Sequence, residues 1–187
     1  MKIYGSYTSP FVRHCRIVLL QTKLACEFIE TNFVQSAQLS PTKKVPMLVD
    51  GDLTLTDSSS IINYLRQKAG GNFFQDIKDF DLFCLADTLL DTTVNIFLLR
   101  TMDNIQIADS KYLQRQSERV LSGLGALNKL DLSTELPLKD GFLRLACFLD
   151  WALYRDLIDI SKLSNLTKFL ALAKTDSDFV STAPPAL

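Results

Sequence analysis

The chain has 187 residues, of which 47% are hydrophobic, and its 20 basic and 21 acidic side chains leave a formal net charge of −1. This length and hydrophobic content suffice for a packed core and exclude a disordered chain. The balanced charge offers no basic excess for binding nucleic acid or an anionic membrane surface.

The first part of the chain alternates between strand and helix patterns. Residues 2–7 (KIYGSY) predict a short strand, and residues 26–33 (CEFIETNF) predict a second one. Residues 9–23 between them predict a helix, with Ser9 placed to cap it and Pro10 just inside its start. This order is that of a βαβ unit, which implies two parallel strands.

A hairpin and a further helix are predicted after a loop. Residues 45–56 (VPMLVDGDLTLT) contain an Asp-Gly step between two strand-like runs, which indicates a tight turn. Residues 57–69 predict a helix that Asp57 or Ser58 can cap and that a Gly-Gly pair ends. The predicted order of the whole region is therefore βαβ, loop, ββα.

The pattern changes after Gly71. Long Leu- and Phe-rich segments with helical periodicity follow, and Pro137 and Ser, Thr and Asp clusters separate them. Such a pattern is typical of an all-α bundle. We therefore expect an α+β domain over residues 1–71 and an all-α domain over residues 76–187.

The spacing of the cysteines and the first residues of the chain indicate its cellular compartment and whether it binds a metal. The start of the chain lacks the apolar run of a signal peptide, and no run approaches the ~20 apolar residues of a membrane span. The cysteines form no C-x-x-C pair and His14 is the single histidine, so we expect no metal site and no disulfide framework. Cys15, in a helix interior, is expected to be a buried structural thiol. A soluble cytoplasmic protein with reduced thiols is the expectation.

Three segments match the motifs of a known family. YTSPFVRHCR (7–16) resembles a Ser/Cys-Pro-Phe-x-x-Arg step at the end of a first strand. KVPMLVDGDLTLTDSSSIINYL (44–65) resembles a core segment that runs from Lys-Val-Pro through Asp-Gly and an acid-Ser pair to Tyr-Leu. SDFVSTAPP (177–185) resembles the Ser-x-Phe-x-x-Thr-x-Pro ending of bacterial members. Together they resemble the glutathione transferase family, which implies a thioredoxin-like N-terminal domain followed by an all-helical domain.

The resemblance implies a glutathione site on the first domain. It implies that the Val45-Pro46 bond is cis and that the Val45 backbone pairs with the cysteinyl unit of glutathione; the alternative is a trans proline that starts a strand. The helix start at Asp57 and Ser58 would hold the γ-glutamyl group, because free N–H donors suit its α-carboxylate and Asp57 can accept from its α-ammonium. The alternative is an ordinary N-cap.

Lys44 directly precedes the Val-Pro step and could pair with a ligand carboxylate, or it could be a solvated surface lysine. Relatives commonly have Asn-Pro-x-Gly-Lys where residues 40–44 of this chain read SPTKK. Whether this altered loop still holds the glycyl end of glutathione stays open at this point. Asp140 is expected to cap a helix of the second domain, as an Asp near this helix does in relatives.

Ser9 is the candidate catalytic residue. Its hydroxyl could donate a hydrogen bond to the glutathione thiolate at a helix N-terminus, as the serine of Ser-type members does. Cys-type members instead form mixed disulfides, so serine predicts addition or displacement chemistry. Tyr7 is a second candidate hydroxyl. An apolar electrophile pocket could be lined by Phe11, Leu99 and Met102, although these residues fit a helix–helix core equally well.

The resemblance therefore implies a glutathione transferase that conjugates the glutathione thiolate to a small apolar electrophile and pairs as a homodimer. No metal or cofactor beyond glutathione as co-substrate is expected. Two alternatives remain open at this point. One is a non-catalytic member that acts through protein contacts, and the other is a glutathione-dependent lyase or isomerase.

Overall fold

The computed structural model describes residues 1–74, 76–132 and 134–186. The chain divides into two compact units, one formed by residues 1–75 with 174–187 and the other by residues 76–173. The C-terminal segment thus groups with the first unit, whereas the sequence patterns placed it in the second domain.

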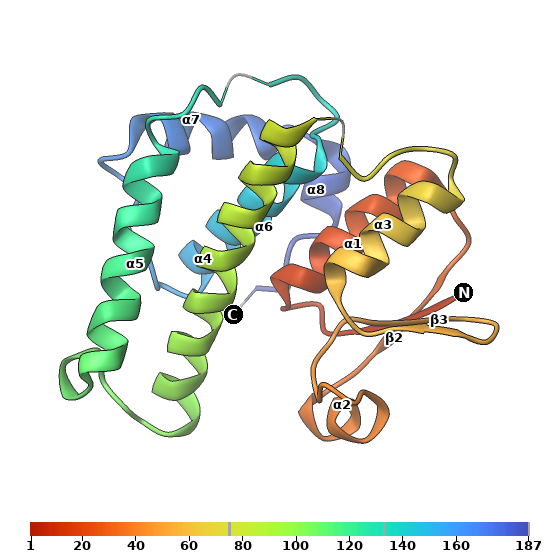
Figure 1. The fold of residues 1–187 in the computed structure, drawn as a ribbon, viewed down its shortest axis with the longest axis horizontal. Coiled ribbons are helices and arrows are strands. Elements are labelled where there is room, and N and C mark those ends of the chain that lie inside the picture. The colour runs from red at the N-terminus through yellow and green to blue at the C-terminus, as the bar shows by residue number, and fades with distance from the viewer. Residues whose placement is uncertain (75, 133, 187) are drawn as a thin grey trace. The chain divides into compact units, whose positions relative to one another are not determined.

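The first unit is built on a four-stranded mixed sheet (Figure 1). The strand order is β2-β1-β3-β4, with β1 parallel to β2, β1 antiparallel to β3, and β3 antiparallel to β4. The parallel pair and the closing hairpin confirm the topology expected from the sequence. The strands are β1 (Lys2–Gly5), β2 (Glu27–Glu30), β3 (Met47–Asp50) and β4 (Leu53–Leu55).

Helices cover both faces of this sheet. Figure 1 shows α1 and α3 together on one face and α2 on the opposite side. The short α8 also packs against α1. The helices are α1 (Pro10–Thr22), α2 (Phe33–Leu39), α3 (Ser58–Lys68) and α8 (Ser177–Ser181).

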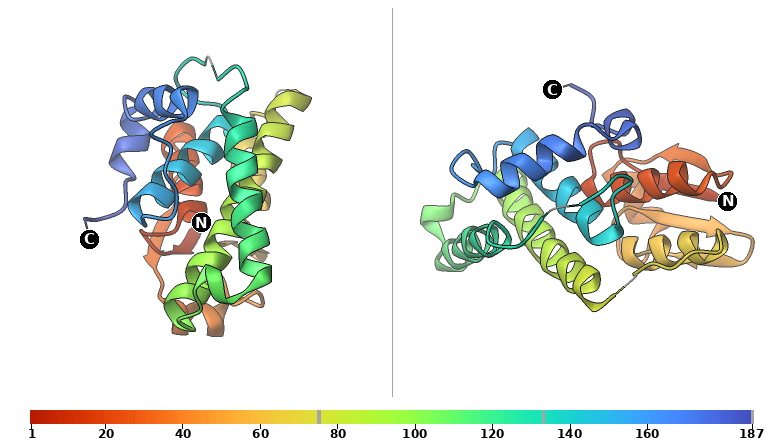
Figure 2. Two further views of the ribbon diagram at one scale, coloured as in Figure 1. Left: turned by 90° about the vertical axis from the view of Figure 1, so that its left-hand side faces the viewer. Right: turned by 90° about the horizontal axis from the view of Figure 1, so that it is seen from above.

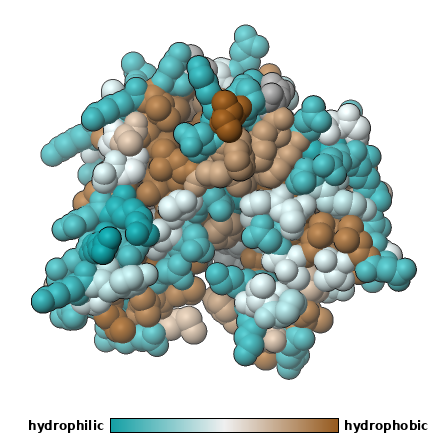
Figure 3. Space-filling model, in the orientation of Figure 1, coloured by the Kyte–Doolittle hydropathy of each residue, from teal (hydrophilic) through white to brown (hydrophobic). Residues whose placement is uncertain are grey.

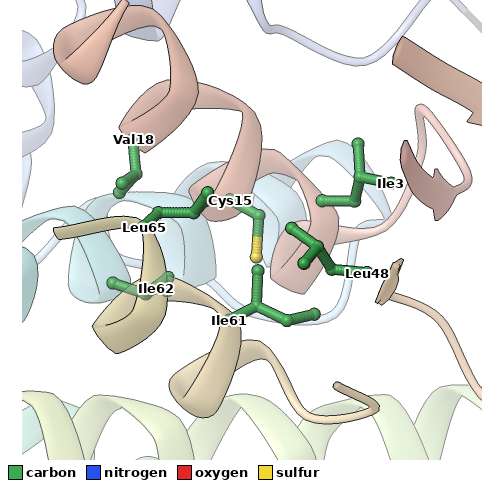
Figure 4. Packing of buried hydrophobic residues seen from close by; sticks show 7 residues of the cluster. All are labelled: Ile3, Cys15, Val18, Leu48, Ile61, Ile62 and Leu65. Carbon is green, nitrogen blue, oxygen red and sulfur yellow. The ribbon is translucent and has the colours of Figure 1, made fainter. Parts of the chain in front are cut away.

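The core of the first unit lies between the sheet and the α1–α3 layer. Burying each such aliphatic side chain contributes about 1.5–3 kcal/mol. Figure 4 shows the side chains of the two helices and of two strands meeting there, including the sulfur of Cys15, which confirms the expected structural cysteine. The cluster consists of Ile3, Cys15, Val18, Leu48, Ile61, Ile62 and Leu65, all of them fully buried.

The prediction of a strand over 26–33 followed by a loop is wrong in part. The strand ends at Glu30, and α2 begins three residues later. Asn32 and Gln35 form a capping box, in which the Asn32 side chain accepts from the Gln35 N–H and the Gln35 side chain accepts from the Asn32 N–H, both at 3.0 Å. This reciprocal cap satisfies two helix-start donors and lets a short helix form where the apolar pattern is weak.

The second unit is all helical, as expected, and α4 and α5 run side by side in it (Figure 2). α4 also packs against α6, and α6 packs against α7. α6 is the most buried of these helices, because it is covered on several sides. The helices are α4 (Ile77–Met102), α5 (Lys111–Leu127), α6 (Asp140–Tyr154) and α7 (Ser164–Ala173), with a 3-10 turn at Ile107–Asp109.

Among the described residues, α4 is long and apolar enough to cross a membrane by length and composition, with a mean hydropathy of 1.6 over its best window. The sequence analysis had instead expected no segment that is long and apolar enough to span a membrane. Core helices of globular proteins pass the same test, and one such helix is weak evidence for a span. The contacts of α4 with α5 and α6 are those of a core helix.

The start of α6 differs from the expectation that Asp140 caps it. The helix begins at Asp140 and the preceding Lys139 makes no side-chain cap within the described part of the chain, so Asp140 stands inside the helix, where it cannot act as N-cap. The acceptor instead comes from α4, since Asp79 Oδ1 accepts from the Gly141 N–H at 3.0 Å. A Cβ on Gly141 would lie 2.5 Å from the Asp79 carbonyl oxygen, so only glycine permits this approach.

Candidate functional site

Three chain segments meet at one end of the sheet in the first unit. Tyr4 of β1 pairs with Met47 of β3, and Leu48 of β3 pairs with Leu55 of β4. Because both pairings are antiparallel, the end of β1, the start of β3 and the end of β4 share one edge. The loop to α1, the Val-Pro step and the link to α3 therefore lie together there, and the N-termini of α1 and α3 both start from this edge.

Ser9 is the N-cap of α1, as predicted. Its Oγ accepts from the Val12 N–H at 3.4 Å, and its backbone has the extended conformation of a capping residue. The side chain is half-buried. Since the oxygen serves as the acceptor, the hydroxyl proton is left to donate to a group placed at the helix start.

Gly5, which the sequence analysis did not single out, sets how closely α1 approaches the end of β1. A Cβ on Gly5 would lie 2.5 Å from Cγ1 of Val12 in the first turn of α1. Glycine at the end of β1 therefore lets the first turn of α1, and with it Ser9, sit close to the sheet edge. The close packing of Val12 against Gly5 gives no signal in the sequence.

Asp57 is the N-cap of α3. Its Oδ1 accepts from the Ser59 N–H at 2.8 Å and from the Ser60 N–H at 3.3 Å. The residue is exposed, and Oδ2 accepts no hydrogen bond from the residues that the structure describes. Ser58 is only 4% exposed, and its carbonyl oxygen accepts from the Cys15 thiol at 3.9 Å. Asp57 thus caps α3 with Oδ1, while Oδ2 accepts no hydrogen bond from the described residues.

The Val45-Pro46 peptide bond is cis, as the resemblance implied. Pro46 is buried, Val45 is half-buried and Lys44 is exposed. This places a charged side chain next to the strand start at the shared edge. The role of Lys44 in pairing with a ligand carboxylate stays a prediction.

The SPTKK turn before this step keeps a conformation that favours glycine. Lys43 has φ +54°, in the left-handed region, and its N–H donates to the Ser40 carbonyl oxygen at 2.9 Å. The Ser40 and Thr42 hydroxyls are hydrogen-bonded at 2.9 Å. A residue with a Cβ is strained in this conformation, which glycine adopts without strain.

Tyr7 is held in an aromatic stack. Its ring centroid lies 4.6 Å from that of Phe28 in β2, and the Arg16 guanidinium lies 4.7 Å from the Tyr7 ring centroid. These contacts direct the Tyr7 ring toward β2, whereas β3 and β4 lie on the other side of β1. Ser9 is therefore better placed than Tyr7 to donate a hydrogen bond to a group at the N-terminus of α1.

The residues predicted for an electrophile pocket are divided between the units. Phe11 lies half-buried in the first turn of α1 in the first unit. Leu99 and Met102 lie at the end of α4 in the second unit, and Met102 is 68% exposed. The pocket stays a prediction.

No cysteine has the features of an activated nucleophile. Cys15 and Cys147 are buried. Burial raises the pKa of the Cys26 thiol and also that of Cys84, so both favour the unreactive thiol form. Among the described residues, no group of three or more His, Cys, Asp or Glu side chains could hold a metal ion.

Comparisons with known proteins assign the first domain. A family model described as "Glutathione S-transferase, N-terminal domain" matches residues 3–73. The uncharacterized GST-like protein YibF of Escherichia coli (strain K12) is 42% identical over 72 residues, which are 35% of this chain and 35% of that protein. Glutathione S-transferase Z1 of Arabidopsis thaliana is 35% identical over 75 residues, 36% of this chain and 34% of that protein. The match spans about a third of the length of these curated relatives.

Similarity over the whole chain is structural. A glutathione S-transferase from Methylobacillus flagellatus, solved with glutathione bound, has a TM-score of 0.85 at 24% identity and covers 98% of this chain and 99% of its own. This likeness confirms the expected fold, a thioredoxin-like domain followed by a helical domain. Residues 3–73 match the N-terminal domain of the glutathione S-transferase family, and the chain as a whole has the fold of a solved glutathione S-transferase.

Proposed function

We propose that the protein binds glutathione on its first unit, in the cytoplasm, and transfers the glutathione thiolate to a small apolar electrophile. The observation that carries this proposal is the meeting of two helix N-termini with the Val45-Pro46 step at one sheet edge. Helix N-termini favour anions, and glutathione brings a thiolate and two carboxylates.

The start of α3 would hold the γ-glutamyl group. The partial positive charge at its N-terminus would favour the α-carboxylate, and the buried position of Ser58 fixes this turn against α1. The Oδ2 atom of Asp57 would accept from the α-ammonium while Oδ1 continues to cap the helix. One residue thus stabilises both the helix start and the ligand. The Val45 backbone would pair with the cysteinyl unit, and Lys44 with a ligand carboxylate.

Ser9 would stabilise the thiolate. The glutathione thiol releases its proton to solvent, and the Ser9 hydroxyl donates a hydrogen bond to the sulfur anion. The sulfur then forms a bond to the electrophilic carbon, and a leaving group such as chloride departs with the electron pair of the broken bond. Lowering the thiol pKa by one to two units requires roughly 1.4–2.7 kcal/mol, within the range of a charged hydrogen bond and a helix start together.

We also propose that two copies of the chain associate as a homodimer. The second unit exposes several large apolar side chains, and Figure 3 shows hydrophobic residues among hydrophilic ones on the face in view. Covering such residues would stabilise an assembly. Light scattering of the purified protein measures whether two copies associate. The residues are Ile77, Phe80, Met102, Tyr112 and Leu121.

Calorimetric titration with reduced glutathione tests binding. We expect a dissociation constant below about 1 mM, equivalent to roughly −4 kcal/mol. Asp57→Asn keeps an oxygen that can cap α3 but removes the charge, so it should weaken binding roughly tenfold with little loss of stability. Equal affinity in wild type and Asp57→Asn would remove Asp57 from the site. No heat and no thermal shift with wild type would contradict glutathione binding as a whole.

The pH dependence of thiol ionisation tests Ser9. Ser9→Ala should raise the pH at which bound glutathione ionises by about one unit, measured by the ultraviolet absorbance of the thiolate. Ser9→Thr keeps the hydroxyl and the cap and should resemble wild type. S-methylglutathione has no thiol to ionise, so its affinity should be similar for all three proteins. An unchanged midpoint in Ser9→Ala would transfer the role to another group, with Tyr7 next.

A further inference from the structure

A buried arginine connects the two ends of the sequence. Arg13, in α1, is 3% exposed and its Nη2 donates to the Phe179 carbonyl oxygen of α8 at 2.9 Å. The same guanidinium lies 3.9 Å from the centroid of the Phe179 ring, which is 1% exposed. A guanidinium that both stacks on a ring and donates to the carbonyl of the same residue has its orientation fixed.

The partner of Arg13 is itself held firmly. Asp176 caps α8 by accepting from the Asp178 and Phe179 N–H groups at 2.9 and 3.0 Å. The Thr182 hydroxyl donates to the Asp178 and Phe179 carbonyl oxygens at 2.9 and 3.0 Å. Hydrogen bonds therefore fix both ends of this short helix, so it can serve as a rigid support.

A second arginine joins α1 to the same support. Arg16, one turn after Arg13, donates from Nη1 to the Thr182 carbonyl oxygen at 3.3 Å. Two cationic side chains thus meet the C-terminal carbonyl groups of α8, where the helix carries partial negative charge. These contacts explain why residues 174–187 group with the first unit.

The fixed arginine lies one helical turn after the candidate catalytic serine. The Arg13 N–H donates to the Ser9 carbonyl oxygen at 3.0 Å, and Val12 between them packs over Gly5. The first turn of α1 is thereby held by the sheet edge on one side and by α8 on another. A shift of this turn would move the Ser9 hydroxyl relative to the thiolate.

We propose that Arg13 and Phe179 are positioning residues for Ser9, so that the C-terminal helix α8 sets how well Ser9 stabilises the glutathione thiolate. This inference rests on the proposed function of Ser9. It assigns a catalytic consequence to a contact between two segments 166 residues apart. Neither residue needs to touch the substrate.

The test is the pH at which bound glutathione ionises, followed by thiolate absorbance in the full chain. Arg13→Lys keeps the charge but loses the fork and the stack, so the midpoint should rise by about one unit, which lowers the thiolate fraction about tenfold below that pH. Affinity for S-methylglutathione should stay within about twofold, because ligand contacts are unchanged. Phe179→Leu should act in the same direction and replaces Arg13→Lys if that variant does not fold.

A control and a double variant separate positioning from general loosening. Arg66→Lys breaks a comparable bond at the other end of α1, from Arg66 Nη2 to Gln21 Oε1 at 2.7 Å, and should leave the midpoint unchanged. If Arg13 acts through Ser9, Arg13→Lys should add nothing to Ser9→Ala. Additive shifts would overturn the inference, as would a wild-type midpoint in Arg13→Lys while Ser9→Ala shifts. No shift in Ser9→Ala itself would instead overturn the proposed function.

Discussion

Helix α6 of the second unit begins in a different way from α1 and α3 of the first unit. In the first unit α1 and α3 start at residues whose own side chains cap them, Ser9 and Asp57, and both starts are partly or fully exposed. In the second unit α6 starts in the buried interior, and its acceptor is Asp79 of α4. An exposed helix start can offer its remaining donors to a ligand, whereas a buried one must be satisfied by a neighbouring helix.

The largest effect should come from closing the space that permits the contact between helices in the second unit. Gly141→Ala would place a Cβ 2.5 Å from the Asp79 carbonyl oxygen, and we expect a loss of about 3 kcal/mol in the free energy of unfolding. Gly125→Ala in α5 is the matched control, because no described atom beyond its own helix turn lies within 4 Å of the added Cβ. It should gain about 0.5–1 kcal/mol. Similar urea midpoints for the two variants would contradict the prediction.

Removing the acceptor itself should have a smaller effect. Asp79→Ala leaves the Gly141 N–H buried without the bond at 3.0 Å, so we expect a loss of about 2 kcal/mol in unfolding free energy. Asp79→Asn keeps an oxygen at the same place and should lose less. Urea denaturation of both variants measures the difference. If alanine and asparagine cost the same, the hydrogen bond to Gly141 is not what stabilises α6.

The unfolding free energies of wild type and Asp79→Asn, compared across pH, test whether the pKa of the Asp79 carboxyl is raised. Burial is the main cause that raises the pKa of the Asp79 carboxyl, and the nearby Asp140 also raises it. Its contribution to stability is therefore greatest below the ordinary carboxyl pKa and is lost as pH rises through the raised value. The stability of wild type relative to Asp79→Asn should fall as pH increases above about 4. A flat difference would show that Asp79 ionises normally.

The smallest effect concerns the turn in the first unit. Lys43 has φ +54°, where a residue with a Cβ is strained by about 1 kcal/mol. Lys43→Gly should therefore stabilise the protein slightly, by at most about 1 kcal/mol, as thermal unfolding would measure. Lys44→Gly is the control, since that backbone has no positive φ to relieve, and it should stabilise nothing. A gain from Lys44→Gly alone would locate the strain elsewhere.

Local signals made the first unit predictable. Ser9 before Pro10, the Asp-Gly turn and Asp57 before an apolar helix pattern each act over a few residues, and each gave an element that the structure confirms. The short α2 was missed because the Asn32 capping box precedes a helix with little apolar periodicity. The topology followed, because a βαβ unit and a hairpin leave few arrangements.

Contacts between distant residues could not be predicted in the same way. Asp79 and Gly141 are 62 residues apart, and Arg13 and Phe179 are 166 apart, so no local pattern pairs them. The motifs contained the Arg and the Phe, but a motif does not state which residues touch. The packing that requires Gly5 was hidden for the same reason, because only the folded backbone brings it against Val12.

The return of the chain to the first unit has a consequence for the order of synthesis. Residues 76–173 are made in full before α8 leaves the ribosome. Until then the guanidinium of Arg13 has neither the ring nor the carbonyl oxygen of Phe179 that receive it in the finished protein. The proposed thiolate site at Ser9 would therefore reach its final geometry only after residues 76–173 and α8 have been translated.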